Sequence, residues 1–585
     1  MLKTLLAQVR EFKKASFLTP FFMILEVLFE TLIPLAMASI IDKGVEAGNI
    51  GHIYRMGGVM VVLALCGLWS GVMGGKYGAL ASTGFARNLR KAMYTNIQTF
   101  SFSNIDKYST AGLITRLTTD VTNLQNAYQM ILRMCTRAPA SLICAMVMAF
   151  LINAKLASIY LIAVIFLGAC LIFIMRKATK YFQTVFRKYD DLNASVQENI
   201  GAVRVVKAYV REDYEISKFQ KACNKVYEMF LSAEKIVVMN MPLMQFTVYA
   251  CILGISWLGA KMIVGSTLTT GELMSLLTYC MNILMSLMML SMVFVMVTMS
   301  IANAERVTEV INDTADITDP ENPVTKVPDG SIVFDHVNFS YKKDSKEPVL
   351  KDINLSIRSG ETIGIIGGTG SGKSTLVSLI SRFYDATSGD VMVDGENVKN
   401  YTKEELCNKV GVVQQRAVLF KGSIRDNMKW GKEDATDAEI WEALTTAQAK
   451  EVVEGKQDQL DFMLEQNGKN LSGGQKQRLS IARALVKKPE ILILDDSSSA
   501  LDFATDAKLR KAVHNLEGNT TTFLVSQRIA GIRQADQILV LGNGTLEGNG
   551  THDELMKTCE VYREIYFSQF PEERVAYNNE SGVIA

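Results

Sequence analysis

The sequence lacks an excess of either charge. Its 585 residues include 61 Lys and Arg against 60 Asp and Glu, which leaves a formal net charge of +1 at pH 7. A nucleic-acid-binding protein usually carries a basic face that neutralises phosphates. This composition gives no sign of one, so we expect no nucleic-acid partner.

The placement of the cysteines and the scarcity of histidine also exclude some classes of protein. The nine cysteines are scattered without a C-x-x-C pair, and most lie in apolar runs, where Cys behaves as a small hydrophobe. Neither a disulfide framework nor a zinc site is expected. Histidine is scarce, and the whole chain contains only His52, His336, His514 and His552.

Apolar residues are unevenly distributed along the chain. Residues 1 to about 300 hold long, sparsely charged apolar runs, whereas residues 330–570 have the composition of a soluble α/β domain. A bilayer core requires about 20 apolar residues per helix. We predict six membrane-spanning helices, at Phe17–Ile41, Met56–Ala81, Ala138–Ile152, Leu156–Met175, Val237–Val264 and Leu273–Met299.

The segments that join these spans differ in length and charge. Those between the second and third spans and between the fourth and fifth are long, helical in pattern and rich in Lys and Arg. Because positive residues favour the cytoplasmic side, we expect both long segments and both termini to be cytoplasmic. The chain is therefore expected to be a multi-pass protein of the cell (plasma or inner) membrane, in contact with the lipid bilayer.

Two features of the predicted spans leave alternatives open. Glu26 and Glu30 are four residues apart in the first span and so share one helix face. They are either an acidic patch that attracts a cationic cargo or a local hydrogen-bonded pair. The sixth span holds eight methionines, which suit an adaptable apolar binding surface or serve as lipid-facing or core filler.

The second half begins with a phosphate-binding pattern. The apolar stretch Glu361–Ile366 is followed by Gly367-Gly368-Thr369-Gly370-Ser371-Gly372-Lys373-Ser374-Thr375, which matches G-x-x-x-x-G-K-S/T. Such glycines let backbone N–H groups surround phosphates at a helix N-terminus. Lys373 is expected to reach the β- and γ-phosphates of ATP, and Ser374 to bind Mg²⁺.

Further motifs follow in order. The apolar strand Ile491–Leu494 ends at Asp495, where a carboxylate that holds Mg²⁺ is expected, and Leu471-Ser472-Gly473-Gly474-Gln475 precedes it. Together these motifs resemble the ATP-binding cassette (ABC) family, and the resemblance covers residues 10–570. Gly112–Asp120, Glu198–Tyr209 and Ala304–Arg306 are similar to the coupling segments and the junction of ABC exporters.

The resemblance implies a fold and a set of site residues. The fold is a membrane all-α domain, with six transmembrane helices and long cytoplasmic extensions (residues 1–310), fused to an α/β P-loop ATPase domain of the ABC type (325–570) and a polar tail (571–585). ATP and Mg²⁺ are the implied ligands. The implied nucleotide-binding residues are Tyr341 (adenine), Gly367, Gly368, Thr369, Gly370, Ser371, Gly372, Lys373, Ser374 and Thr375, with Ser472, Gly473, Gly474, Gln475 and Asp502; the implied metal ligands are Ser374, Gln415 and Asp495.

Two catalytic positions depart from the family pattern. Asp496 stands where the family has a glutamate that polarises the attacking water, and Gln527 stands where it has a switch histidine. Aspartate is one methylene shorter, which withdraws the carboxylate by about 1.5 Å. Glutamine cannot carry positive charge. Together with Gln415, which senses Mg²⁺ and γ-phosphate in the family, these residues predict a site that binds ATP and hydrolyses it slowly.

The signature Leu471–Gln475 is intact, and in the family it completes the ATP site of the partner chain. This asymmetry resembles the degenerate subunit of heterodimeric bacterial multidrug exporters. We therefore expect a second, non-identical half-transporter that carries the catalytic Glu and His, and a small amphipathic cargo. An ATP-gated channel, a regulatory subunit that does not translocate, and an active homodimeric exporter remain alternatives.

Overall fold

The chain forms two compact units. The structure, a computed structural model, describes residues 1–327, 329–342, 347–497, 499–516 and 519–574, so most of the expected tail lies outside the described residues. One unit consists of Met1–Gln98 and Ser109–Asp313, and the other of Thr99–Tyr108 and Thr314–Ala585. The second unit thus contains a short segment from within the helical half of the chain.

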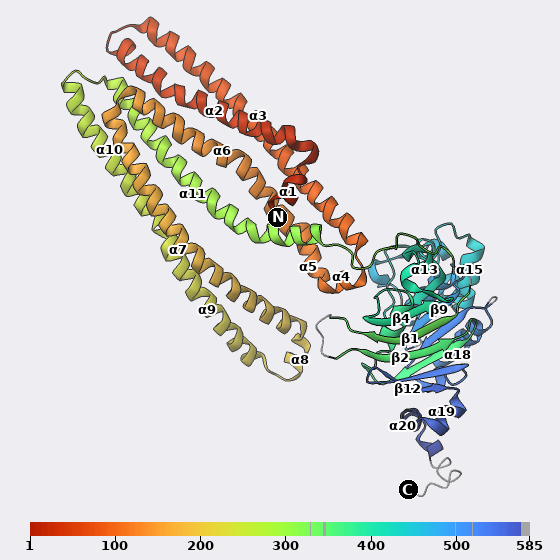
Figure 1. Ribbon diagram of the computed structural model, residues 1–585. Helices are drawn as coiled ribbons and strands as arrows, with labels where there is room; N and C mark the ends of the chain where they lie inside the picture. The colour runs from red at the N-terminus through yellow and green to blue at the C-terminus, as the bar shows by residue number, and fades with distance from the viewer. Residues whose placement is uncertain (328, 343–346, 498, 517–518, 575–585) are drawn as a thin grey trace. The chain divides into compact units, whose positions relative to one another are not determined.

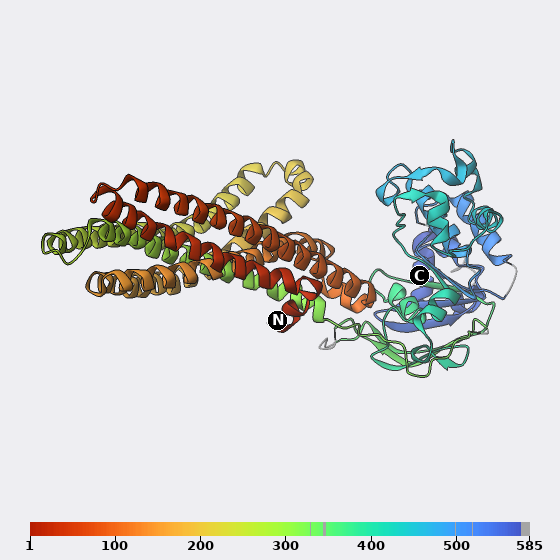
Figure 2. The same ribbon diagram turned by 90° about the horizontal axis from the view of Figure 1, so that it is seen from above.

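The first unit is entirely helical (Figure 1). Six of its helical segments are long and apolar enough to cross a membrane, which confirms the expected number of spans. Within this unit, the extension formed by α7, α8 and α9 diverges from the other helices in both views (Figures 1 and 2). The helices are α1 Leu2–Ala7, α2 Lys13–Ile40, α3 Ile50–Thr99, α5 Thr110–Thr115, α6 Val121–Ile152, α7 Ala154–Gly201, α8 Val203–Ala208, α9 Glu212–Val238, α10 Asn240–Val264 and α11 Thr270–Asn312.

Several of these helices are far longer than a bilayer requires. Helix α3 has 50 residues and α7 has 48, and each corresponds to more than ~70 Å at the rise of an α-helix, against a hydrocarbon core of about 30 Å. The short third span of the sequence interpretation is the C-terminal part of α6. Asn153 ends the tight connection to α7, because its side chain accepts hydrogen bonds from the backbone N–H groups of Lys155 and Leu156.

An ion pair with a buried carboxylate joins two distant segments of the helical unit. Arg306 donates to both carboxylate oxygens of Asp120, at 2.8 and 2.7 Å, and Asp120 is 1% exposed. Arginine presents a planar fork that matches a carboxylate, and such paired bonds fix geometry. The segment Gly112–Asp120 and the junction Ala304–Arg306, both marked by the sequence, are thereby held together.

The second unit contains two large sheets. An antiparallel sheet has the order β2-β1-β4-β5, and a six-stranded sheet has the order β12-β11-β3-β10-β9-β6, in which all neighbouring strands but β12 pair in parallel. Parallel strands buried on both faces read as continuous apolar runs, as Ile491–Leu494 does. The strands are β1 Ile332–Phe339, β2 Leu350–Ile357, β3 Thr362–Gly367, β4 Ser388–Val393, β5 Glu396–Asn397, β6 Val410–Val413, β9 Ile491–Asp495, β10 Thr521–Val525, β11 Gln537–Gly542 and β12 Thr545–Gly550.

Helices and a two-stranded ribbon complete this unit (Figure 2). Because the parallel strands end at one edge of the sheet, the loops that follow β3, β9 and β10 come together there. The remaining elements are β7 Gly422–Ser423, β8 Met463–Leu464, α12 Lys373–Ile380, α13 Lys403–Lys409, α14 Ile424–Lys429, α15 Asp437–Thr446, α16 Lys450–Glu454, α17 Gly473–Leu485, α18 Phe503–His514, α19 His552–Thr558 and α20 Glu560–Gln569.

Helix α4, Phe102–Lys107, belongs to the second unit although it follows directly on α3 in the sequence. The ring of Phe102 stacks on Phe383 with centroids 4.3 Å apart, and the Tyr384 hydroxyl donates to the Asp106 carboxylate at 2.6 Å. Asn104 donates to the carbonyl of Thr314 at 2.9 Å. The segment that packs within the second unit therefore lies just before Gly112–Asp120, the segment identified from the sequence.

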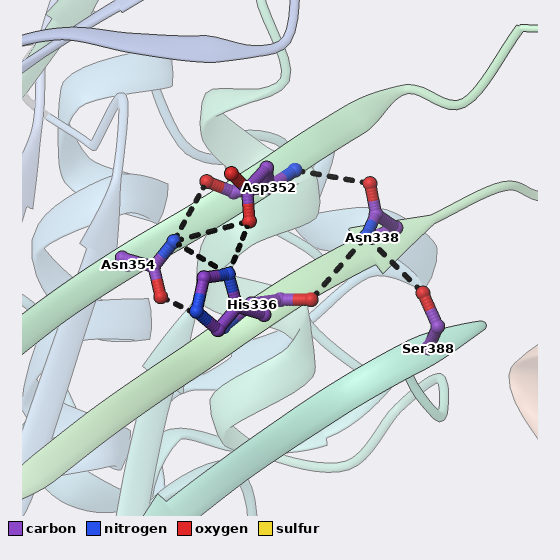
Figure 3. Close-up of polar contacts among 5 residues, drawn as sticks. All are labelled: His336, Asn338, Asp352, Asn354 and Ser388. Atoms are coloured by element: carbon purple, nitrogen blue, oxygen red, sulfur yellow. Dashed lines mark hydrogen bonds and ion pairs between the residues drawn. The ribbon is translucent and has the colours of Figure 1, made fainter.

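A polar cluster occupies two facing irregularities of β1 and β2 (Figure 3). His336 and Asp352 both have φ near +47°, a backbone conformation that His and Asp adopt more readily than most residues. His336 Nδ1 lies 2.6 Å from Asp352 Oδ1, and Asn354 donates to the same carboxylate oxygen at 3.1 Å. Asn338 links the cluster to Ser388 of β4 at 3.1 Å.

This cluster predicts a pH-dependent contribution to stability. The hydrogen bond and charge of Asp352 raise the pKa of His336, and the bond from His336 lowers the pKa of Asp352. The raised His pKa gives stability that is complete below the unfolded value of about 6.5 and is lost as pH rises through the folded value. The lowered Asp pKa gives stability that is complete above about 3.9 and is lost as pH falls through the folded value.

The pair should therefore contribute most between about pH 4 and pH 6.5. Asp352→Asn should lower the melting temperature of the second unit more at pH 6 than at pH 8.5. The difference should be small because both side chains are exposed and screened by salt. Thermal melting of the two proteins at both pH values measures it. An equal loss at both values would show that the ion pair contributes nothing.

Candidate functional site

The phosphate loop lies between β3 and α12. Gly367 ends the strand, Gly368–Gly372 form the turn, and Lys373 begins the helix, as the sequence motif requires. Gly372 has φ +96°, and a Cβ there would lie 2.7 Å from the Leu350 side chain, so the turn requires glycine at this position. Backbone N–H groups of a glycine-rich turn followed directly by a helix N-terminus suit an anion.

The Lys373 side chain closes over this turn. Its ammonium donates to the carbonyl oxygens of Gly367 and Gly368 at 2.9 and 2.7 Å. Burial lowers the pKa of Lys373, while the carboxylates of Asp495 and Asp496 oppose that shift. The Ser371 hydroxyl is buried and has no hydrogen-bond partner among the described residues. A buried polar atom of this kind calls for a partner, and a phosphate oxygen bound at this loop would supply one.

The pair Ser374 and Asp495 fits a divalent cation. The Ser374 hydroxyl, one residue into α12, donates to Asp495 Oδ1 at 3.0 Å, at the end of β9. Burial raises the pKa of Asp495 above its usual value, and the hydrogen bond from Ser374 opposes part of that shift. A hydroxyl and a carboxylate side by side at a phosphate loop are oxygen ligands of the type that Mg²⁺ prefers. Mg²⁺ held there would offset the negative charge of ATP phosphates.

Asp496 and Gln415 come together beside this pair. Gln415, in the loop after β6, donates through Nε2 to Asp496 Oδ2 at 3.2 Å. Asp496 has φ +45°, and its backbone N–H donates to the Val525 carbonyl at 3.0 Å. Asp496, the position that the sequence assigns to water activation, is thus held by its backbone, and its carboxylate contacts Gln415 in the loop after β6.

Tyr341 lies at the outer side of the phosphate loop. Its hydroxyl and that of Thr375 are 2.9 Å apart, and its ring meets Phe339 and Tyr384 edge-on at 4.9 and 5.2 Å. Tyr341 is 51% exposed, and an aromatic ring of this kind suits stacking with another flat ring.

Gln527 occupies the loop after β10, and its neighbours hold that loop from three sides. Gln569, the last residue of α20, donates to the Gln527 carbonyl at 2.8 Å and accepts from the Ile529 N–H at 2.9 Å. The Arg528 guanidinium lies over the Phe503 ring at 5.0 Å, and Arg510 donates to the Ala530 carbonyl. Sequence reasoning missed Gln569, because no motif marks a side chain that contacts a loop 42 residues away.

The signature residues lie apart from the phosphate loop of the same chain. Ser472 caps α17, accepting from the Gln475 N–H, and the Gln475 side chain accepts from the Ser472 N–H in return. In the part of the chain that the structure describes, no hydrogen bond joins Ser472, Gly473, Gly474 or Gln475 to residues 367–375. Ser472 and Gly473 are exposed, so a phosphate on another molecule can reach them.

Asp502 caps a neighbouring helix. Its carboxylate accepts from the Thr505 N–H at 2.9 Å at the start of α18, and that bond lowers the pKa of Asp502. A Cβ at Gly474 would lie 3.0 Å from the Ala500 carbonyl, so the signature and the loop before Asp502 are adjacent. Both therefore belong to one exposed surface of the ATPase unit.

This fold and these residues define an ABC transporter subunit. Residues 16–301 match the ABC transporter transmembrane region, and residues 350–499 match the ABC transporter ATPase. The chain is 37% identical over 570 residues to the uncharacterized ABC transporter ATP-binding protein YfiB of Bacillus subtilis (strain 168), with 96% of this chain and 99% of that protein covered. The chain belongs to the ABC transporter family.

Two further similarities concern the exporter type. The chain is 32% identical over 488 residues to the ATP-dependent lipid A-core flippase of Desulfotalea psychrophila (strain LSv54 / DSM 12343), covering 83% of this chain and 84% of that protein. It superposes on a bacterial Atm1-family ABC exporter with ATP bound at a TM-score of 0.81 and 23% identity, covering 96% and 99% of the two chains. The fold is therefore that of an ABC exporter half-transporter, which confirms the expected fold class and family.

Proposed function

We propose that this chain is the degenerate-site subunit of a heterodimeric ABC exporter. Its own phosphate loop, Asp495 and Gln415 bind Mg·ATP, and its signature completes the ATP site of a non-identical partner chain. ATP binding and hydrolysis drive the export of an amphipathic compound across the cell membrane, with both termini in the cytoplasm. The observation that carries the proposal is the pairing of an intact signature with Asp496 and Gln527.

Asp496 is the first reason to expect slow hydrolysis at this chain's own site. Its carboxylate is withdrawn by about 1.5 Å relative to a glutamate, and a misplacement of order 1 Å can cost about a hundredfold in rate. One of its oxygens accepts from Gln415 at 3.2 Å, which leaves less of the carboxylate free to orient water.

Gln527 is the second reason. A glutamine side chain donates a hydrogen bond but carries no positive charge, so it stabilises developing charge on a phosphate less than an imidazolium does. None of the four histidines stands next to Gln527 in the sequence. Of these, His336 contacts Asp352 on β2 and His552 contacts Tyr562 on α20, so these two imidazoles are engaged elsewhere in the ATPase unit.

One relative supports an amphipathic substrate. By its printed name it is an ATP-dependent lipid A-core flippase. The eight methionines expected in the last span lie on α11. Of these, Met281, Met285 and Met292 are exposed within this chain, and the Met299 side chain lies outside the described residues. Flexible, polarizable side chains of this type accommodate apolar groups of differing shape.

The first test is purification of this chain from its native membrane in mild detergent, followed by mass spectrometry of the proteins that accompany it. We expect a second ABC half-transporter that carries a glutamate and a histidine at the positions of Asp496 and Gln527. Recovery of this chain alone as a stable dimer would contradict the heterodimer. Uptake of cargo into inverted vesicles against its gradient would then distinguish a pump from an ATP-gated channel, which allows flux only down the gradient.

A further inference from the structure

A charged pocket lies among α2, α3 and α6 of the helical unit. Its volume is about 530 Å³. Its lining includes Glu26 and Glu30 of α2, Arg133 of α6, and an apolar wall of α3 that contains Leu63, Leu68 and Val72. Ionisable groups in membrane-spanning segments are costly and usually have a functional reason.

The two glutamates share one cation. Arg137 lies 3.1 Å from Glu26 Oε1, and it donates to both carboxylate oxygens of Glu30 at 2.8 and 3.0 Å. Glu26 Oε2 is buried and has no hydrogen-bond partner among the described residues. The acidic pair is therefore neither a purely local pair nor an open acidic patch, because a single guanidinium balances one of its two charges and leaves a surplus carboxylate.

Arg133 supplies the opposite charge. Its guanidinium has no hydrogen bond or ion pair within the part of the chain that the structure describes, and it acts electrostatically on Glu26. Its aliphatic stem lies close to Gly78 of α3, where a Cβ would be 3.2 Å from Cδ. The pocket therefore presents one cation that makes no direct polar contact and one surplus carboxylate, which attract each other without touching, beside apolar side chains.

Glycines of α3 make room at the surplus carboxylate. A Cβ added at Gly71 would lie 3.1 Å from Glu26 Oε1 and 3.4 Å from Oε2. These distances are tighter than ordinary carbon contacts, so any larger residue would press on the Glu26 carboxylate, which lines the pocket. At Gly75, one turn further along the same helix, an added Cβ would have no neighbour within 4 Å.

We propose that this pocket binds the headgroup of a zwitterionic amphipath, which carries an ammonium and an anionic group next to an apolar tail. The ammonium pairs with Glu26, the anionic group pairs with Arg133, and the tail lies along Leu63, Leu68 and Val72. A ligand with only a positive charge leaves Arg133 without a partner. A ligand with only a negative charge leaves the surplus carboxylate without a partner. In both cases a charge without a partner at low dielectric costs binding free energy. The inference rests on the proposed export of amphipathic compounds and specifies their class.

The test is native mass spectrometry of the intact purified complex in an uncharged maltoside detergent. The probe is a short-chain phosphatidylethanolamine, compared with a phosphatidylglycerol of equal chain length, an alkylammonium and tail-less glycerophosphoethanolamine. We expect the phosphatidylethanolamine to bind most tightly. Gly71→Ala should weaken its binding about tenfold, and the matched Gly75→Ala should leave it unchanged.

Arg133→Gln provides an independent variant that does not alter the packing at Gly71. It should weaken phosphatidylethanolamine binding about tenfold and leave alkylammonium binding unchanged or stronger. Equal binding of phosphatidylglycerol, equal binding of the tail-less compound, or equal effects of Gly71→Ala and Gly75→Ala would each overturn the inference. The number of lipid molecules bound to this chain does not depend on the identity of its partner chain. The heterodimer proposal is tested separately, by the proteins that co-purify with this chain.

Discussion

Gly473→Asp is expected to reduce ATP hydrolysis by the intact complex by about a hundredfold or more. Gly473 is exposed at the N-terminus of α17, directly after the cap Ser472. Free N–H groups and the helix dipole favour an anion there. An aspartate would place its own negative charge where a phosphate of the partner's ATP is proposed to bind, and loss of one preorganised donor alone costs about a hundredfold or more in comparable sites.

The same chain supplies the comparisons for this experiment. Gly473→Ala adds a Cβ without a charge, and that atom would have no neighbour within 4 Å in this chain, so it should fold equally well and lose less activity. Lys373→Ala removes the ammonium from this chain's own phosphate loop. In the proposed asymmetric complex it should reduce turnover far less than Gly473→Asp, because it damages the slow site.

Steady-state ATPase rates of the complex, with nucleotide binding measured in parallel, distinguish a complex with one slow ATP site from a complex with two equivalent ATP sites. Equal losses from Lys373→Ala and Gly473→Asp would mean that both sites turn over alike. The degenerate-site proposal would then be wrong even though the motifs are correctly identified.

Much of this architecture could be predicted from the sequence because its signals are local. An apolar run of about 20 residues is sufficient to indicate a span, and the phosphate loop is a contiguous motif whose glycines are dictated by its backbone. Gly372 illustrates this, since its φ of +96° and its contact with Leu350 leave no room for a side chain. The pairing of Ser374 with Asp495 likewise follows from the loops after β3 and β9, which lie at the same edge of the parallel sheet on either side of β10.

The features that could not be predicted depend on contacts between distant residues. The sequence left the meaning of Glu26 and Glu30 open, because the arginine that binds both is 107 residues after Glu30. The membership of α4 in the ATPase unit rests on Phe102 and Phe383, which no periodic pattern connects. In each case a specific side-chain pair decides the outcome, and periodicity reports only which face of a helix is apolar.

The double variant Asp496→Glu with Gln527→His is expected to raise ATP hydrolysis by the complex, with about a tenfold or larger gain at this chain's own site. Glutamate extends the carboxylate toward the γ-phosphate, and the imidazole adds a group that can carry positive charge. The two changes act on one water molecule, so their combined effect should exceed the sum of the single effects. Asp496→Asn with Gln527→His serves as the control that lacks a carboxylate.

The position of Asp496 adds a structural condition to this experiment. Its φ of +45° favours Asp over Glu, since a short polar side chain tolerates the left-handed conformation better. A modest loss of melting temperature in Asp496→Glu is therefore expected and does not count against the gain in rate. Adding Lys373→Ala to the double variant should cancel the gain, which locates it at this chain's phosphate loop. If turnover stays unchanged in a folded double variant that binds ATP, then Asp496 and Gln527 do not limit hydrolysis, and the asymmetry of the complex must have another origin.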